Sequence, residues 1–319
     1  MADRLPGNLK LGLVLLVAIA LAAIAAPLFA TDRPWIARDE RGLSFPAWRA
    51  LLPGVAPRTN PGAQVVLAAP IPHDPNDIDL AAVLEPPGRG HWLGTDDLGR
   101  DLASRIVHGA RVSLAVGLLS ALVAVTIGVP LGAWAGYRRG LADFAVSRLV
   151  EAVLSFPTLL LVLAVLAVAS GSLSGLSEIA RVALVLGLTG WMPIARYLRA
   201  EYLRLRESEM VTAARAVGGG HVRIVARHIL PSALAPVLVT ATFAVGSAIA
   251  TEAALSFLGL GIRPPHATWG SLLADSREQI ERAWWLACFP GLALFVALLG
   301  CNFVGEGVRD LLDPRMRQR

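Results

Sequence analysis

The chain has 319 residues, of which 55% are hydrophobic and 17% charged, and its mean hydropathy is +0.59. A soluble domain carries about 25% charged residues, so this composition excludes a water-soluble globular protein, and the hydrophobicity excludes a disordered chain. The formal net charge is +5, and Lys10 is the only lysine among 29 basic residues. A Walker-type nucleotide loop is absent, because that motif needs Gly-Lys before Ser or Thr and Lys10 precedes Leu11.

Six stretches are long and apolar enough to cross a bilayer. A spanning helix needs about 20 mostly apolar residues, and a backbone that faces lipid must satisfy its hydrogen bonds within the helix. The expected fold is therefore an all-α integral membrane protein with six transmembrane helices. The predicted spans are about 9–30, 113–136, 152–170, 179–198, 233–256 and 284–305.

The basic residues favour one orientation in the membrane. Short cytoplasmic loops are enriched in Arg and Lys, and the short loops of this chain place both termini in the cytoplasm. The expected domains follow from that topology. They are an N-terminal tail with the first helix (1–30), an outer segment (31–111), a core of five helices (112–306) and a cytoplasmic tail (307–319).

The outer segment falls into two parts. Residues 31–94 are rich in Pro and Gly and predict an irregular structure, whereas residues 95–111 predict an amphipathic helix. Thr95 is the expected N-cap of that helix. Its predicted i,i+4 ion pairs are Asp96–Arg100 and Asp101–Arg105.

A metal site is a second interpretation of the same segment. Its acidic and imidazole side chains are ligand types that bind divalent metals. We favour the capped helix, and expect no metal, because two of the acids already have arginine partners in the predicted helix. The four side chains concerned are His91, Asp96, Asp97 and Asp101.

Small residues and one acid stand out within the spans. Gly128, Gly132 and Gly136 recur every four residues, a pattern that lets membrane helices approach closely. They would pack within this subunit or against a partner. Glu252 lies near the end of the fifth span, where an acid faces protein or water. It would line a pathway or pair with a neighbouring polar group.

The loop at 200–231 is long for a connection between spans. It predicts two short helices around a glycine break at 218–220, the first over 202–217 and the second over about 221–230, stopping before Pro231. Ala213 and Ala214 would present a smooth surface that another backbone can approach, with Arg215 and Arg223 at its rim. Residues alone leave a second interpretation open, a basic loop attracted to anionic lipid.

A family resemblance favours the first interpretation. Thr212-Ala-Ala-Arg-Ala-Val-Gly218, followed by Ile229-Leu230-Pro231, resembles the "EAA" loop of ABC-importer permeases, with Thr212 where the family usually has Glu. The blocks at 91–101, 109–114, 251–261 and 309–314 resemble the dipeptide, oligopeptide and nickel permeases. The resemblance is nearly continuous over about residues 90–315.

The resemblance implies a type I ABC-importer permease of the bacterial inner (plasma) membrane that catalyses no reaction. Its coupling loop would comprise Thr212, Ala213, Ala214, Arg215, Gly218, Arg223, Leu230 and Pro231. The implied partners are a second, homologous permease subunit, two ATP-binding subunits that hold ATP and Mg²⁺, an extracytoplasmic solute-binding protein and the lipid bilayer. The chain itself would bind neither a cofactor nor nucleic acid. It would form half of the translocation pathway of an ATP-driven importer whose expected solutes are peptides.

The rival class is an ion-coupled secondary carrier. Such carriers use inverted repeats and charges or broken helices near the middle of the membrane. The sequence has no clear internal repeat, and the centres of the predicted spans lack ionisable residues. The importer subunit is therefore the favoured prediction.

Overall fold

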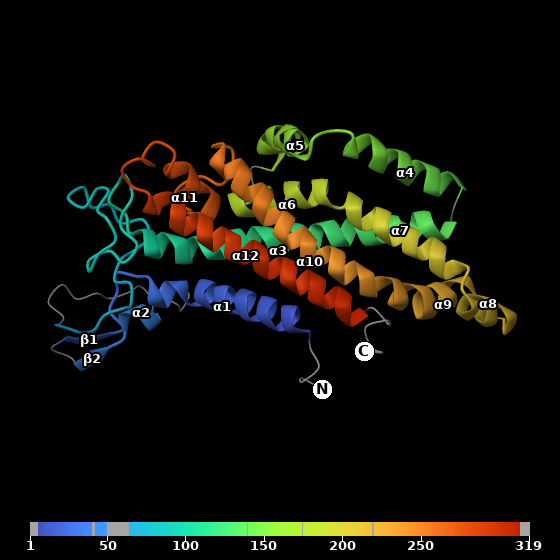
Figure 1. Cartoon of the computed structure of the whole chain (residues 1–319), viewed down its shortest axis with the longest axis horizontal. Coiled ribbons are helices and arrows are strands. Elements are labelled where there is room, and N and C mark those ends of the chain that lie inside the picture. Colours follow the sequence, from blue (N-terminus) through green and yellow to red (C-terminus); the bar gives the residue numbers. More distant parts are fainter. Residues whose placement is uncertain are drawn as a thin grey trace. The chain divides into compact units, whose positions relative to one another are not determined.

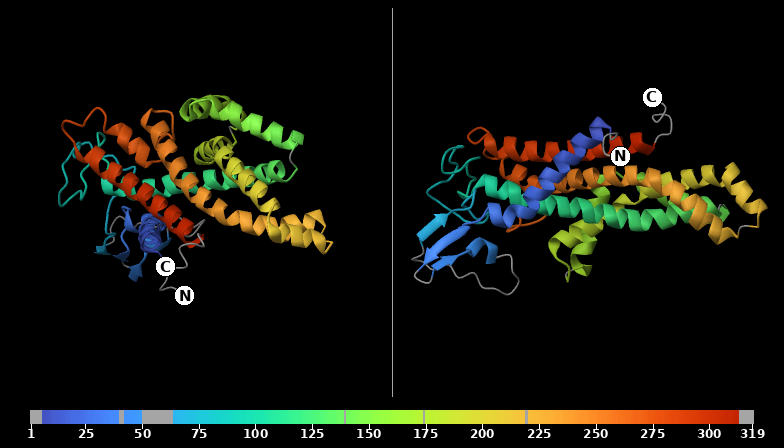
Figure 2. Two further views of the ribbon diagram at one scale, coloured as in Figure 1. Left: turned by 45° about the vertical axis from the view of Figure 1, so that its right-hand side comes forward. Right: turned by 90° about the horizontal axis from the view of Figure 1, so that it is seen from below.

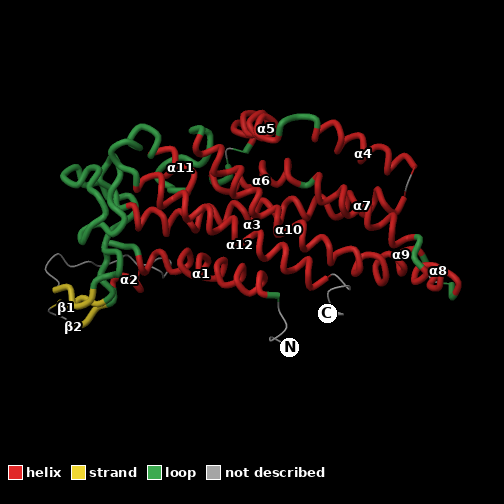
Figure 3. The backbone as a smooth tube through the Cα atoms, viewed as in Figure 1, coloured by secondary structure: helices red, strands yellow, loops and turns green. Residues whose placement is uncertain are grey.

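The computed structural model describes residues 6–39, 42–49, 64–138, 140–173, 175–218 and 220–312 (Figure 1). The predicted glycine break includes Gly219, and the predicted C-terminal tail includes residues 313–319, which lie outside those ranges. Helices dominate the described chain (Figure 3). The chain divides into two compact units. The first contains residues 1–15, 115–251 and 298–319, and the second contains residues 16–114 and 252–297.

Five helical stretches of the described chain are long and apolar enough to cross a membrane. Each coincides with a predicted span, because an uninterrupted apolar run of this length is the strongest signal that a sequence carries. The stretches are α1 (Gly7–Phe29), α3 (Leu102–Arg138), α6 (Glu178–Gly190) with α7 (Met192–Arg206), the run Arg227–Phe257 that contains α10 (Leu230–Phe257), and α12 (Trp285–Leu312).

The remaining predicted span, 152–170, is not one straight helix. α4 (Gly140–Leu154) and α5 (Thr158–Ser172) meet there at an angle of 98°. They are the two light-green helices of Figure 2. The cause is Pro157, which has no N–H to continue the helix and disfavours the helical conformation in the residue before it. Counted as one bent span, this pair brings the candidate spans among the described residues to six.

The predicted irregular structure after the first helix contains a small sheet. β1 (Ile36–Asp39), β2 (Gly42–Ser44) and β3 (Gln64–Leu67) pair antiparallel in the order β2-β1-β3, and α2 (Pro46–Arg49) follows β2. Strands of three or four residues contain too few alternations to be recognised in a sequence. The prediction of an irregular segment was therefore wrong for these residues.

The predicted outer helix at 95–111 does not begin at Thr95. Residues 95–101 form turns, with Gly99 at φ +74°, and α3 begins at Leu102 and continues through the second predicted span. Asp101 caps α3, since its Oδ1 accepts a hydrogen bond from the Ser104 N–H at 2.7 Å. Gly94 and Gly99 both have a positive φ and permit tight turns here. These turns explain why the helix starts at Leu102, seven residues after Thr95.

The second unit has its own apolar cluster. α11 (Trp269–Asp275) enters it, and its N-terminus has a capping box in which Thr268 and Ser271 satisfy each other's backbone N–H groups. The buried apolar residues of this cluster are Leu102, Ala267, Leu272, Ala283, Trp285 and Leu286. The cluster joins the start of α3 to α11 and α12.

The loop before α10 also differs from its prediction. The helix expected over 202–217 is interrupted at Glu207 and Ser208, so α8 spans only Glu209–Ala216. The second helix does not stop before Pro231. α9 (His221–Ile224) continues through a π-helix, η2 (Val225–Ile229), into α10. The wider π turn accommodates the proline ring, which would clash with a regular α-helical turn before it.

Candidate functional site

The loop between α7 and α10 carries a hollow on its exposed side. α8 packs beside α9 and η2, near one end of the first unit in Figure 1. Met210 and Val217 are exposed apolar residues, and Val217 is 86% exposed. The residues that line the hollow are Met210, Ala213, Ala214, Val217, Arg223, Ile224 and His228.

The turn that closes α8 depends on Gly218. Its φ is +77°, a left-handed conformation that glycine adopts without a steric penalty. The Gly218 N–H donates to the Arg215 carbonyl at 2.9 Å, and the Val217 N–H donates to the Ala213 carbonyl at 3.2 Å. These bonds end the helix and leave Val217 at the tip of the loop.

The inner face of the loop is fixed to the rest of its unit. Val211, Ile224 and Ile229 are buried in one apolar cluster with Leu198 and Tyr202 of α7. Ala214 is half-buried against the same cluster, whereas Ala213 is exposed. The two alanines of the predicted motif therefore have different surroundings, and Ala213 is the one available to a partner.

Polar contacts fix the loop and α7 to neighbouring helices. The Arg206 guanidinium donates to the Tyr137 carbonyl at the end of α3, at 2.9 Å. Arg199 of α7 binds Asp143 of α4 through two hydrogen bonds, one of them 2.9 Å long. A displacement of the loop would thus be transmitted to α7 and, through these contacts, to α3 and α4.

The glycines of α3 pack directly on α7. A Cβ added at Gly132 would lie 2.5 Å from the Ala195 carbonyl oxygen, and one at Gly136 would lie 2.5 Å from the Tyr202 Cβ. At Gly128 the nearest atom would be the Trp191 carbonyl oxygen, at 2.8 Å. Of the two packing partners expected from the sequence, the structure places these glycines against a helix of the same chain.

The other predicted loop residues lie at the surface or at the start of α10. Thr212, Arg215 and Arg223 are exposed, and the Thr212 hydroxyl donates to the Ser208 carbonyl at 3.2 Å. Leu230 packs against the apolar cluster of the unit, and Pro231 follows it in the first turn of α10. The surface thus combines small apolar residues with basic side chains.

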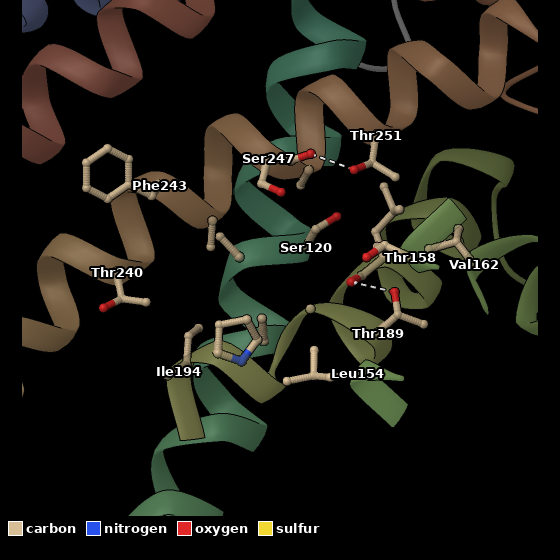
Figure 4. Close-up of a pocket in the computed structure, with 17 residues that line it drawn as sticks. Ser120, Leu154, Thr158, Val162, Thr189, Ile194, Thr240, Phe243, Ser247 and Thr251 are labelled. Carbon is tan, nitrogen blue, oxygen red and sulfur yellow. Dashed lines mark hydrogen bonds between the residues drawn. The ribbon is translucent and has the colours of Figure 1, made fainter. Parts of the chain in front are cut away.

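The first unit also contains a cavity of about 270 Å³ between α3, α4, α5, α6, α7 and α10. Figure 4 shows its labelled side chains around a common space. Its lining, within the described part of the chain, contains no charged residue. Six hydroxyl groups line it instead, from Ser120, Thr158, Thr189, Thr240, Ser247 and Thr251.

Several of these hydroxyls are partly satisfied by their own helices. Thr251 donates to the Ser247 carbonyl at 2.8 Å, and Thr189 donates to the Val185 carbonyl at 3.0 Å. Each keeps an oxygen lone pair for a guest molecule. The buried Ser120 hydroxyl has no partner among the described groups, so it is able to donate as well. The cavity therefore suits a molecule that has polar groups, and its lining offers no charged side chain to pair with a charged group.

Sequence reasoning missed these cavity residues and the exposed Val217. Isolated Ser and Thr residues within an apolar span are common, since their hydroxyls bond the preceding turn of the helix. The available signal was their recurrence, with Thr240, Ser247 and Thr251 on α10 alone.

Glu252, the acid expected in or near a pathway, is fully buried in the second unit. Its Oε1 accepts a hydrogen bond from the Ser256 hydroxyl at 2.6 Å. The Ser256 hydroxyl in turn accepts from Thr268 at 3.4 Å. Of the two roles left open by the sequence, this geometry matches pairing with a neighbouring polar group.

The predicted ion pairs before α3 are rearranged. The Arg100 Nε binds Asp96 at 2.8 Å, as the predicted pair requires. Arg105, however, binds Asp96 and also Asp275, at 3.1 Å, and not Asp101. Burial raises the pKa of the Asp275 carboxyl, and the Arg105 and Arg100 guanidinium groups oppose that shift.

Thr95 and Asp101 have other partners. The Thr95 hydroxyl donates to the Ala82 carbonyl and accepts from the Glu85 N–H at 2.8 Å, so Thr95 fastens the preceding coil rather than capping a helix. Asp101 binds His91 at 2.9 Å. The error in the predicted pairing follows from the late start of α3.

Known proteins provide an independent comparison. Residues 128–318 match the family model described as "Binding-protein-dependent transport system inner membrane component". A putative peptide transport system permease protein of Brucella suis is 38% identical over 97% of this chain and 88% of its own length. A dipeptide transport system permease protein of Alkalihalophilus pseudofirmus is 43% identical over 73% of this chain and 75% of its own length.

The fold has a counterpart among solved structures. An inward-facing structure of the MetNI methionine ABC transporter contains a chain with 21% sequence identity and a TM-score of 0.52. The match covers 66% of this chain and 96% of that chain. The apolar helices, the fold and the match over more than half of the sequence agree: this chain belongs to the family of binding-protein-dependent transport system inner membrane components.

Proposed function

We propose that this chain is the permease subunit of an ATP-driven peptide importer and that its loop at 200–231 couples it to a separate ATPase. The main support for this proposal is that the two faces of the loop differ. Its inner face is buried against α7, and its outer face exposes small apolar residues around a hollow. Such a surface suits a protein groove better than a lipid headgroup, which arginines alone would attract.

The loop would transmit the motion of the ATPase into the membrane. Closure of two ATP-binding subunits would displace α8, and the apolar cluster around Tyr202 would carry that displacement to α7. The glycine contacts would carry it on to α3. A rigid-body shift of this kind converts an inward-open state into an outward-open one.

The cavity would form part of the solute pathway. Uncharged hydroxyls offer both donors and acceptors to the amide groups that every peptide shares. Relatives named as peptide and dipeptide permeases support this class of solute. A second permease subunit would complete the pathway, and an extracytoplasmic binding protein would deliver the solute. ATP and Mg²⁺ would be held by the ATPase subunits.

The test replaces Ala213 by Asp in the complete transporter, reconstituted in liposomes with labelled dipeptides. A charge buried in a docking contact costs a few kcal/mol, and each 1.4 kcal/mol is about tenfold in affinity. We therefore expect ATPase binding and transport to fall at least about tenfold, while the abundance of this exposed-site variant stays normal.

The matched control is Ala213→Ser, which adds a small neutral group at the same place and should transport nearly as well as the native chain. Import should require ATP and should continue after ion gradients are dissipated. Normal transport by Ala213→Asp with its ATPase bound would refute the coupling role. Import driven by an ion gradient without ATP would instead support a secondary carrier.

A further inference from the structure

A cluster of two histidines and an aspartate lies in the second unit, in the coil before α3 and at the residue that caps it. Figure 1 shows this coil and the start of α3. His73, His91 and Asp101 each offer one possible metal-ligand atom, and the three atoms lie within 4.8 Å of one another. The two histidines are half-buried and Asp101 is buried. The three side chains come from separate parts of the segment, so the fold itself brings them together.

Hydrogen bonds already orient each of the three side chains. The His73 Nε2 lies 3.0 Å from the Gly90 carbonyl oxygen, and the His91 Nδ1 lies 2.9 Å from Asp101 Oδ2. A carbonyl oxygen only accepts, so His73 donates from Nε2 and retains a lone pair on Nδ1. The other Asp101 oxygen accepts from the Ser104 N–H. These bonds fix His73 and Asp101 in place. The contact between His91 Nδ1 and Asp101 would be exchanged for bonds to the ion, and its proton would be released to solvent.

Helix capping and charge pairing do not account for the whole cluster. They explain Asp101, which caps α3, and His91, which binds Asp101. Neither capping nor charge pairing explains the position of His73. Its ring centroid lies 4.4 Å from that of His91, and the two ring planes are inclined at 31°. The sequence predicted no metal because it assigned Asp101 to Arg105. The structure pairs Arg105 with Asp96 and Asp275 instead, so that reason no longer applies.

We propose that His73, His91 and Asp101 bind a divalent transition-metal ion of the zinc class. Two imidazole nitrogens and one carboxylate oxygen are a ligand set that Zn²⁺ uses, whereas Mg²⁺ and Ca²⁺ take oxygen ligands. Tetrahedral zinc bonds of about 2.0–2.2 Å place two ligand atoms roughly 3.4 Å apart. The ligand atoms here lie within 4.8 Å of one another, so the most distant pair must approach by up to about 1.4 Å. Water would fill the fourth position, because both histidines are only half-buried.

The experiment uses the full chain, purified without a polyhistidine tag and stripped of metal with EDTA. Co²⁺ is then titrated, and its visible absorption reports tetrahedral or five-coordinate binding. We expect saturation at one Co²⁺ per chain and displacement by Zn²⁺. His73→Gln should lower the Co²⁺ affinity by at least roughly 10–100-fold, since it removes a ligand, while its amide N–H still reaches the Gly90 carbonyl.

The matched control is His266→Ala, which removes an exposed histidine of the same unit and should leave the affinity unchanged. Zn²⁺ should raise the melting temperature of the native chain and of this control, but not that of His73→Gln. The metal-free melts of all three proteins should coincide, which shows that His73→Gln folds. A linear, unsaturable Co²⁺ response, or equal affinity in His73→Gln, would overturn the proposal.

Discussion

Asp96 joins the turn before α3 to α3 itself. Its side chain is almost fully buried, and it accepts hydrogen bonds from the Leu98 and Arg100 N–H groups at 2.9 and 3.0 Å. It also binds the side chains of Arg100 and Arg105. Arg105 is 5% exposed, so its charge depends on this carboxylate and on Asp275 for compensation.

Asp96→Asn is therefore expected to destabilise the protein. Removing one partner of a buried ion pair costs about 3–5 kcal/mol. Asp275 would remain paired with Arg105, so part of that cost is expected. The melting temperature of the purified chain should fall clearly. Asp97→Asn is the control, because the Asp97 side chain is 49% exposed and lies 3.8 Å from Arg100. Its effect should stay within about 0.5 kcal/mol. Equal melts for the two variants would refute the role assigned to Asp96.

The sequence predicts part of this residue-scale detail. The Asp96–Arg100 spacing indicated a pair that the structure contains. The Arg105–Asp275 contact joins residues 170 positions apart, and no local pattern predicts such a contact. Likewise, His73 lies 18 residues before His91 in a coil, and only the fold brings their rings together.

At the scale of elements, length decides what the sequence can predict. Apolar runs of about 20 residues indicate spans, because the bilayer imposes their length. Strands of three or four residues, the 98° bend at Pro157 and the π-helix before Pro231 depend on tertiary context. The motif at 212–218 indicated the loop, yet which alanine faces outward follows only from how α8 packs beside α9 and η2.

The turn after α8 permits a test with two glycines of the same loop. Gly218 has φ +77°, and nothing lies within 4 Å of a Cβ added there, so Gly218→Val would strain the backbone without a clash. A left-handed conformation costs about 1–2 kcal/mol in residues with a side chain. We expect Gly218→Val to displace the tip of the loop and to lower solute-stimulated ATP hydrolysis by the reconstituted transporter, with normal abundance in the membrane.

Gly220→Val is the matched control for that variant. Gly220 also has open space around its Cα, but its φ is not positive, so the same substitution adds no left-handed strain. It should retain most of the stimulated hydrolysis. If both variants lose activity equally, added bulk on the loop matters more than the conformation of Gly218, and the proposed role of the turn would be wrong.

Across the whole chain, the proposed function depends on which side of the membrane the loop faces. Residues 196–231 contain seven arginines, whereas the shorter connection at 171–182 contains only one. This asymmetry favours a cytoplasmic loop, where an ATPase can reach it. The same topology places residues 31–111 outside, where a binding protein can reach them. The proposed contacts with the ATPase and with the binding protein therefore both require the same orientation in the membrane.

Cysteine labelling tests this orientation. In a chain whose Cys288 and Cys301 are replaced by Ser, single cysteines would be introduced at the exposed positions Asn76 and Val217. A membrane-impermeant maleimide added to intact spheroplasts should label Asn76→Cys and leave Val217→Cys unlabelled. Permeabilised membranes should label both, which shows that each thiol is reactive. Labelling of Val217→Cys from outside would place the loop on the wrong side for an ATPase, because nucleotide hydrolysis that powers import occurs in the cytoplasm.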